Sequence, residues 1–113
     1  MVTRKNDLSQ IWFLTSVYIE SIMRHPTNGE IKAKHSTRTF GYYRGWAKAI
    51  KAVQENRCNM HECLYQYLIM ERIGEGVHSL CKDEQWFRWT GRKWTSLKQK
   101  PEWARGTINW AIG

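Results

Sequence analysis

The chain has 113 residues and a formal net charge of +8, with 18 Lys and Arg against 10 Asp and Glu. This length fits a single domain spanning residues 1–113, and a globular composition with two prolines argues against disorder. Three cysteines argue against a disulfide-built secreted fold, and no stretch approaches the roughly twenty apolar residues of a membrane span. We therefore expect a cytoplasmic protein with no membrane partner.

The first third of the chain predicts a β-hairpin. Residues 11–22 are rich in β-branched and aromatic side chains and contain no Gly or Pro, which favours a long strand. Asn28-Gly29 is a hairpin signal, so residues 31–40 are expected to return antiparallel. The glycine-flanked segment 41–45 (GYYRG) is predicted to end this second strand.

A helix is predicted next. Apolar side chains recur at the three- and four-residue spacing of one helix face, at Trp46, Ala49, Ile50 and Val53. This spacing predicts an amphipathic helix from Trp46 to about Asn56. Asn59, with Glu62 three residues later, resembles a capping box for one further short turn.

The second half of the chain predicts more strands. Residues 65–73 are predicted to form a buried strand, and residues 85–89 and 94–97 a hairpin in which Trp89 faces Trp94. Side-chain alternation then places Phe87, Trp89 and Trp94 on one face, and Trp86, Arg88 and Leu97 on the other.

The last elements complete the expected fold. Residues 101–105 predict one helical turn, and residues 107–112 predict a closing strand. The fold class is therefore α+β: a mostly antiparallel twisted sheet with one main amphipathic helix. One helix leaves the other sheet face uncovered, so we expect a homo-oligomer.

The thiols and imidazoles are the residues to weigh as a metal site or a catalytic pair: Cys58, His61, Cys63, His78 and Cys81. Their spacing lacks the C-x2-C of common zinc sites, so we predict no metal and no other cofactor. Cys58 and His61 have no third, orienting group in the sequence. The chain also lacks a P-loop and a G-x-G-x-x-G motif, so we do not expect an enzyme.

Tryptophans and cations gather toward the end of the chain. Five of the seven tryptophans lie within the last 28 residues, together with six Lys or Arg and a single carboxylate, that of Glu102. Flat rings beside fixed cations suit a ligand that carries both bases and phosphates. A second basic segment, residues 24–57, mixes arginines with rings around Gly41, and the two basic segments are expected to meet on one face. The candidate ligand-binding residues are Arg38, Phe40, Tyr42, Tyr43, Arg44, Arg88, Trp89 and Arg105.

Four segments resemble a family of short uncharacterised proteins carried by phages and prophages of gut-type bacteria: residues 38–43 (RTFGYY), 55–58 (ENRC), 67–76 (YLIMERIGEG) and 109–113 (NWAIG). The resemblance extends over roughly residues 36–113. In size, charge and aromatic content the chain is also similar to phage anti-defence proteins of the Thoeris-inhibitor kind, which sequester cyclic ADP-ribose or cyclic oligonucleotide signals.

This resemblance implies an anti-defence accessory protein in the cytoplasm of a bacterial host cell. Such a protein would bind a small anionic nucleotide, cyclic in the systems it resembles, and withhold it from a host immune effector. Two alternatives stay open at this point. One is a protein-binding inhibitor such as an anti-CRISPR, whose partner would be a host immune protein. The other is a small nucleic-acid-binding protein.

Overall fold

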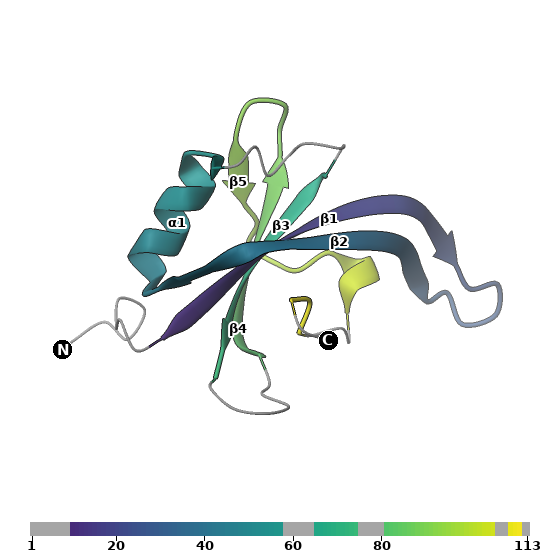
Figure 1. The fold of residues 1–113 in the computed structure, drawn as a ribbon. Helices are drawn as coiled ribbons and strands as arrows, with labels where there is room; N and C mark the ends of the chain where they lie inside the picture. The colour runs from purple at the N-terminus through teal and green to yellow at the C-terminus, as the bar shows by residue number, and fades with distance from the viewer. Residues whose placement is uncertain (1–9, 58–64, 75–80, 106–108, 112–113) are drawn as a thin grey trace.

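The computed structural model describes residues 10–57, 65–74, 81–105 and 109–111. They form a five-stranded antiparallel sheet in the order β2-β1-β3-β4-β5, with one helix on one face (Figure 1). The elements are β1 (Ile11–Arg24), β2 (Ile31–Arg44), α1 (Trp46–Gln54), β3 (Tyr67–Ile73), β4 (Cys81–Trp89), β5 (Trp94–Ser96) and the 3₁₀ turn η4 (Glu102–Ala104). The predicted α+β class is confirmed. Among these residues no helix has the length and apolar character needed to span a membrane.

The β1–β2 hairpin is longer than the sheet to which it belongs. β1 pairs with β3 only as far as Val17, but it pairs with β2 to the end of the hairpin at Arg24. Residues 18–24 and 31–36 therefore continue as a two-stranded ribbon, called here the arm, which curves away from the sheet (Figure 1). The predicted turn at its tip is confirmed: the Gly29 N–H donates to the His25 carbonyl oxygen at 3.1 Å, and Gly29 has a φ of 70°.

β2 does not end where the sequence suggests. The prediction that residues 41–45 end the strand is wrong for residues 41–44, because Gly41 forms a β-bulge instead of a break. Leu14 pairs with Gly41 and Thr15 with Thr39, which leaves Phe40 as the extra residue of the bulge. Gly41 has a φ of 148°, and the strand then continues to Arg44.

The core on one face of the sheet lies beneath α1. Trp12, Leu14, Leu68, Met70, Phe87 and Trp94 of the sheet are buried there with Ala49, Ala52 and Val53 of the helix. The predicted amphipathic helix is therefore confirmed, although it ends at Gln54, two residues earlier than expected. The predicted register of the second hairpin is also confirmed, since Trp89 pairs with Trp94 and their rings pack edge-on at 5.3 Å.

The opposite sheet face is covered as well, which corrects the expectation that it lies free. Residues 97–105 and 109–111, called here the C-terminal segment, lie on this face, where Ala104 and Trp110 pack on Val17, Ile69 and Trp86. η4 confirms the predicted helical turn. Asn109, Trp110 and Ala111 do not form the predicted closing strand, and Trp110 and Ala111 lie in a turn instead; residues 107, 108 and 112 of that prediction fall outside the described ranges. An uncovered apolar face is therefore no longer a reason to expect a homo-oligomer, which stays a prediction.

Candidate functional site

Four of the predicted ligand-binding residues lie together around the bulge of β2. The Arg38 guanidinium lies over the Phe40 ring, 4.9 Å from its centre. Arg57, which follows α1, lies 5.7 Å from the centre of the Tyr43 ring and donates to the Tyr43 hydroxyl at 3.2 Å. Phe40, Tyr42, Tyr43 and Arg57 line a shallow hollow of about 110 Å³, too small for a whole nucleotide.

The other predicted residues lie elsewhere. Arg44 is paired with Ile11 at the far end of β2, and Arg88 and Trp89 lie on β4, two strands away from β1. Arg105 follows η4 on the face that the C-terminal segment covers. Arg38 is opposite Ser16 on the α1 face, whereas Arg88 is opposite Tyr67, which packs on the other face. The structure therefore does not bring Arg38, Arg88 and Arg105 together on one face, although Lys32 and Arg105, one from each basic segment, line a common cleft.

A larger cleft, called here the arm cleft, lies between the arm and η4. Its volume is about 660 Å³, within the range of sites that hold small ligands. Ile31, Ala33 and His35 alternate along β2 and line one side, and Trp103 and Arg105 line the other. One of the predicted arginines, Arg105, is thus part of a concave site.

The aromatic side of the arm cleft is held firmly in place. Trp103 is half-buried, and its ring packs edge-on against the rings of Tyr67 at 5.3 Å, Trp86 at 5.7 Å and Trp110 at 6.1 Å. The His35 ring lies 5.0 Å from Trp110 and 6.2 Å from Trp103. Because the His35 Nδ1 lies 3.2 Å from the Ala33 carbonyl oxygen, this nitrogen is the donor in that contact.

The charges around the arm cleft are mixed. Lys32 and Arg105 line it together with Glu30 and Glu102, and the Lys32 ammonium lies 3.8 Å from the Glu30 carboxylate. The Arg105 guanidinium has no ion pair with any residue that the structure describes. The cleft therefore suits an anion because it places an uncompensated guanidinium beside fixed rings, and not because its net charge is high.

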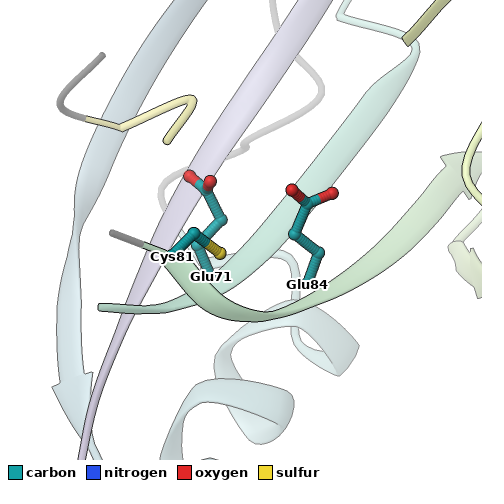
Figure 2. A group of neighbouring side chains, drawn as sticks. All are labelled: Glu71, Cys81 and Glu84. Atoms are coloured by element: carbon teal, nitrogen blue, oxygen red, sulfur yellow. The ribbon is translucent and has the colours of Figure 1, made fainter. Parts of the chain in front are cut away.

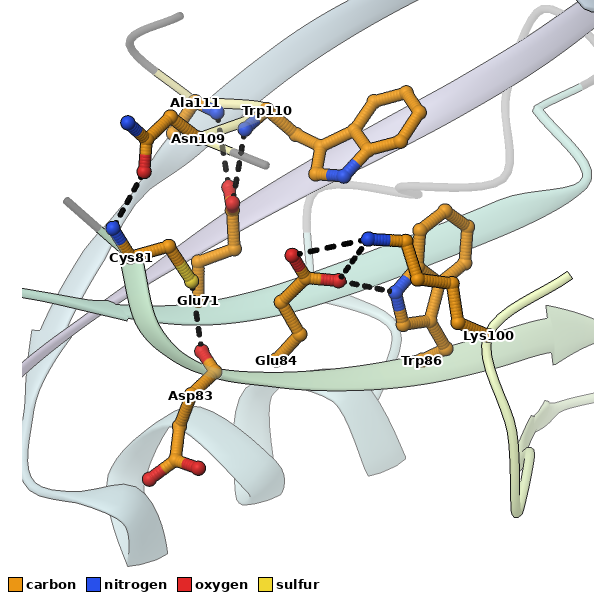
Figure 3. Close-up of polar contacts among 9 residues, drawn as sticks. All are labelled: Glu71, Cys81, Asp83, Glu84, Trp86, Lys100, Asn109, Trp110 and Ala111. Carbon is orange, nitrogen blue, oxygen red and sulfur yellow. Dashed lines mark hydrogen bonds and ion pairs between the residues drawn. The ribbon is translucent and has the colours of Figure 1, made fainter. Parts of the chain in front are cut away.

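Polar side chains of β3 and β4 form a separate group. The carboxylates of Glu71 and Glu84 and the thiol of Cys81 have ligand atoms within 4.8 Å of one another (Figure 2). Glu71 is fully buried on β3, and its two oxygens accept the backbone N–H groups of Trp110 at 2.8 Å and Ala111 at 2.9 Å (Figure 3).

The other two members of this group also have partners. Glu84 accepts the Trp86 indole N–H at 2.9 Å and lies 3.1 Å from the Lys100 ammonium (Figure 3). The Cys81 thiol donates to the Asp83 carbonyl at 3.0 Å, and the Cys81 backbone N–H donates to the Asn109 side chain. With both carboxylates engaged, this group fastens the C-terminal segment to the sheet and offers a metal few free ligand atoms.

Burial raises the pKa of two members of this group, Cys81 and Glu71. It raises the pKa of the Cys81 thiol to about 12, with the nearby Glu71 and Glu84 carboxylates adding to the effect. Burial also raises the pKa of Glu71, against the opposing effect of its two backbone N–H donors. A protonated thiol is a poor metal ligand and a poor nucleophile. Of the other thiols and imidazoles weighed as a metal site, Cys58, His61, Cys63 and His78 lie outside the described residues, as does the predicted Asn59–Glu62 capping box.

A third hollow lies between α1 and the β4–β5 hairpin. Its volume is about 470 Å³, and apolar side chains such as Ile50, Phe87 and Trp94 line much of it. Lys93 is the one cation among its described lining residues, and the Trp46 indole N–H on its wall donates to Gln85 at 2.8 Å. An anionic ligand has less to bind here than in the arm cleft.

Sequence reasoning missed three residues that organise these sites. Glu71 interrupts the apolar run of β3, and a charged residue inside a predicted buried strand signals a buried partner. Trp103 stands two residues before Arg105, a pairing visible in the sequence. His35 carried no comparable signal, because its place beside Trp103 depends on how the arm curves.

Comparison of the chain with protein-family models, curated proteins and solved structures gave no significant match. The resemblance to phage and prophage proteins accordingly stays a prediction.

Proposed function

We propose that the arm cleft binds a small anionic nucleotide and that the protein acts by sequestering it. One observation carries the proposal: a cleft of about 660 Å³ has the Trp103 and His35 rings along its walls, together with the Arg105 guanidinium, which forms no ion pair with a described residue. A base would stack on the rings and a phosphate would accept hydrogen bonds from the guanidinium. The fixed packing of Trp103 lowers the entropic cost of such a complex.

Sequestration requires binding without chemistry. The thiol of Cys81, on β4, has a pKa raised to about 12 and is a poor nucleophile at neutral pH. In this proposal the ligand is held intact and is released when the protein unfolds. By the phage resemblance, the ligand is a cyclic nucleotide signal that would otherwise reach a host immune effector.

The test is to incubate the protein with cyclic ADP-ribose and with cyclic di-adenylate, remove unbound ligand by filtration, and identify by mass what the denatured protein releases. We expect one of them to be recovered with its mass unchanged. Arg105→Gln should weaken its binding about ten- to a hundredfold, because a charge-assisted hydrogen bond is lost, and should leave the melting temperature unchanged.

Arg88→Gln is the matched control, since it removes an exposed guanidinium from the same sheet face outside the arm cleft. Equal losses from the two variants would show a response to overall charge and would refute the arm cleft as the site. Recovery of a cleaved nucleotide would refute sequestration. If neither nucleotide is retained, the result would favour the alternative of an inhibitor that binds a host immune protein.

A further inference from the structure

A row of cations and rings follows the outer strand of the sheet, on the face opposite the arm cleft. Residues along β2 alternate without interruption from Ile31 to Thr39, so Lys32, Lys34 and Arg38 share one face. His35 and Thr37 point to the other face, since Thr37 is paired with Val17 in the core beneath the C-terminal segment. This row is separate from the arm cleft except for Lys32, which also lines the cleft.

The bulge extends the row with aromatic rings. Phe40 and Tyr43 both pack at the edge of the core beneath α1, so they lie on the same face as Arg38. Each ring carries a guanidinium, Arg38 over Phe40 and Arg57 over Tyr43. We call the whole set the β2 row; its members are Lys32, Lys34, Arg38, Phe40, Tyr43 and Arg57.

Lys32, Lys34 and Arg38 of the β2 row are available to a partner, whereas the Arg57 guanidinium is paired with the Glu55 carboxylate at 2.9 Å. The side chains of Lys32 and Lys34 are 75% and 79% exposed, and each is 3.8–3.9 Å from a carboxylate, a separation that contributes little to stability in water. Arg38 has no carboxylate partner among the described residues. Lys32 and Arg38 are six residues apart, which corresponds to about 20 Å along an extended strand.

We propose that the β2 row binds single-stranded nucleic acid, with phosphates along Lys32, Lys34 and Arg38 and bases against Phe40 and Tyr43. A line of cations tracks a phosphate backbone, and half-buried rings beside it offer stacking surfaces. A duplex hides the faces of its bases, so the rings favour a single strand as the partner. This inference goes beyond the arm cleft and does not depend on it.

The test uses the whole protein and a fluorescein-labelled oligothymidylate of about fifteen nucleotides, with binding followed by anisotropy over a range of salt concentrations. The double variant Lys34→Gln/Arg38→Gln should weaken binding at least tenfold. It should also lower the slope of log affinity against log salt by about 1.4, since two phosphate contacts are lost. The control Lys48→Gln/Lys51→Gln removes the same charge from exposed positions on α1 and should change neither value.

Phe40→Leu separates stacking from charge. It should weaken binding about five- to a hundredfold with an unchanged salt slope, and a thermal melt shows whether the variant still folds. The proposal is overturned if no binding occurs at low salt, or if the α1 control loses as much affinity as the β2 variant. It is also overturned if a duplex of equal length binds more tightly and Phe40→Leu has no effect. Arg105→Gln should bind the oligonucleotide normally, so failure of the arm cleft and failure of the β2 row are distinguishable.

Discussion

Glu71 is the residue on which the C-terminal side of the molecule depends most directly. Its carboxylate is fully buried within β3 and accepts the backbone N–H groups of Trp110 and Ala111, so it satisfies two donors that would otherwise be orphaned. The cost of burying a charge is only partly offset by these two hydrogen bonds, and the net effect is a raised pKa.

The raised pKa of Glu71 predicts how stability depends on pH. The folded protein binds the proton of the Glu71 carboxyl more tightly than the unfolded chain does. Protonation of Glu71 therefore stabilises the folded state, and this stabilisation is fully present at pH values below the ordinary carboxyl pKa. It is lost as pH rises through the raised pKa of the folded state. We expect the free energy of unfolding to fall across this window, and Glu71→Gln to remove the dependence.

Urea unfolding, followed by tryptophan fluorescence between about pH 4 and about pH 8, measures this slope. Glu102→Gln is the control, because it removes an exposed carboxyl on η4 and should leave the slope as it is. A Glu71→Gln protein with the slope of the unmodified chain would show that Glu71 does not titrate as its burial implies.

Among the elements, β2 depends most on a single glycine. Gly41 has a φ of 148°, a value that side-chain-bearing residues rarely adopt, while a Cβ built there meets no atom within 4 Å. The cost of Gly41→Ala is therefore expected to come from the backbone alone and to be about 1 kcal/mol. Denaturant midpoints measure it, with Ser36→Ala on the same strand as a control. Unchanged stability of Gly41→Ala would argue against a bulge at this position in solution.

The same elements show what the sequence could and could not predict. The β1–β2 turn and the Trp89–Trp94 pairing were predictable because Asn-Gly and the alternation around residues 90–93 are local signals. Gly41 was misjudged because a glycine that ends a strand and one that forms a bulge look alike without the partner strand. The closing strand failed for Trp110 and Ala111 because Glu71, about forty residues away, takes the N–H groups that a sheet would use.

For the candidate sites too, contacts between sequence neighbours were predictable and contacts between distant segments were not. The Arg38–Phe40–Tyr43 group was predictable, since its members are neighbours on one strand. Of the residues that line the arm cleft, the sequence predicted only Arg105 as a ligand-binding residue. The cleft forms where His35 meets a segment about seventy residues later in the chain. A long-range juxtaposition of this kind depends on the register and curvature of the arm, and neither leaves a local pattern.

On the scale of the whole molecule, the sheet is a layer between two unlike covers. α1 lies over one face and the C-terminal segment over the other, and tryptophans contribute to both cores. Trp12 and Trp94 are buried on the α1 face, whereas Trp86, Trp103 and Trp110 gather on the other. Much of the tryptophan content therefore fills the core, and Trp103 is the tryptophan that this packing presents to the arm cleft.

This division of the tryptophans provides the most direct test of the arm cleft as a nucleotide site. Each indole N–H gives its own signal in a nitrogen-15 correlation spectrum, and Trp103→Phe identifies the Trp103 signal. Titration with the cyclic nucleotide that the protein retains should move the signal of Trp103 and that of its neighbour Trp110, while Trp12 and Trp94 stay in place. Shifts confined to Trp46 and Trp94, which line the hollow beside α1, would place the ligand elsewhere and contradict the proposed site.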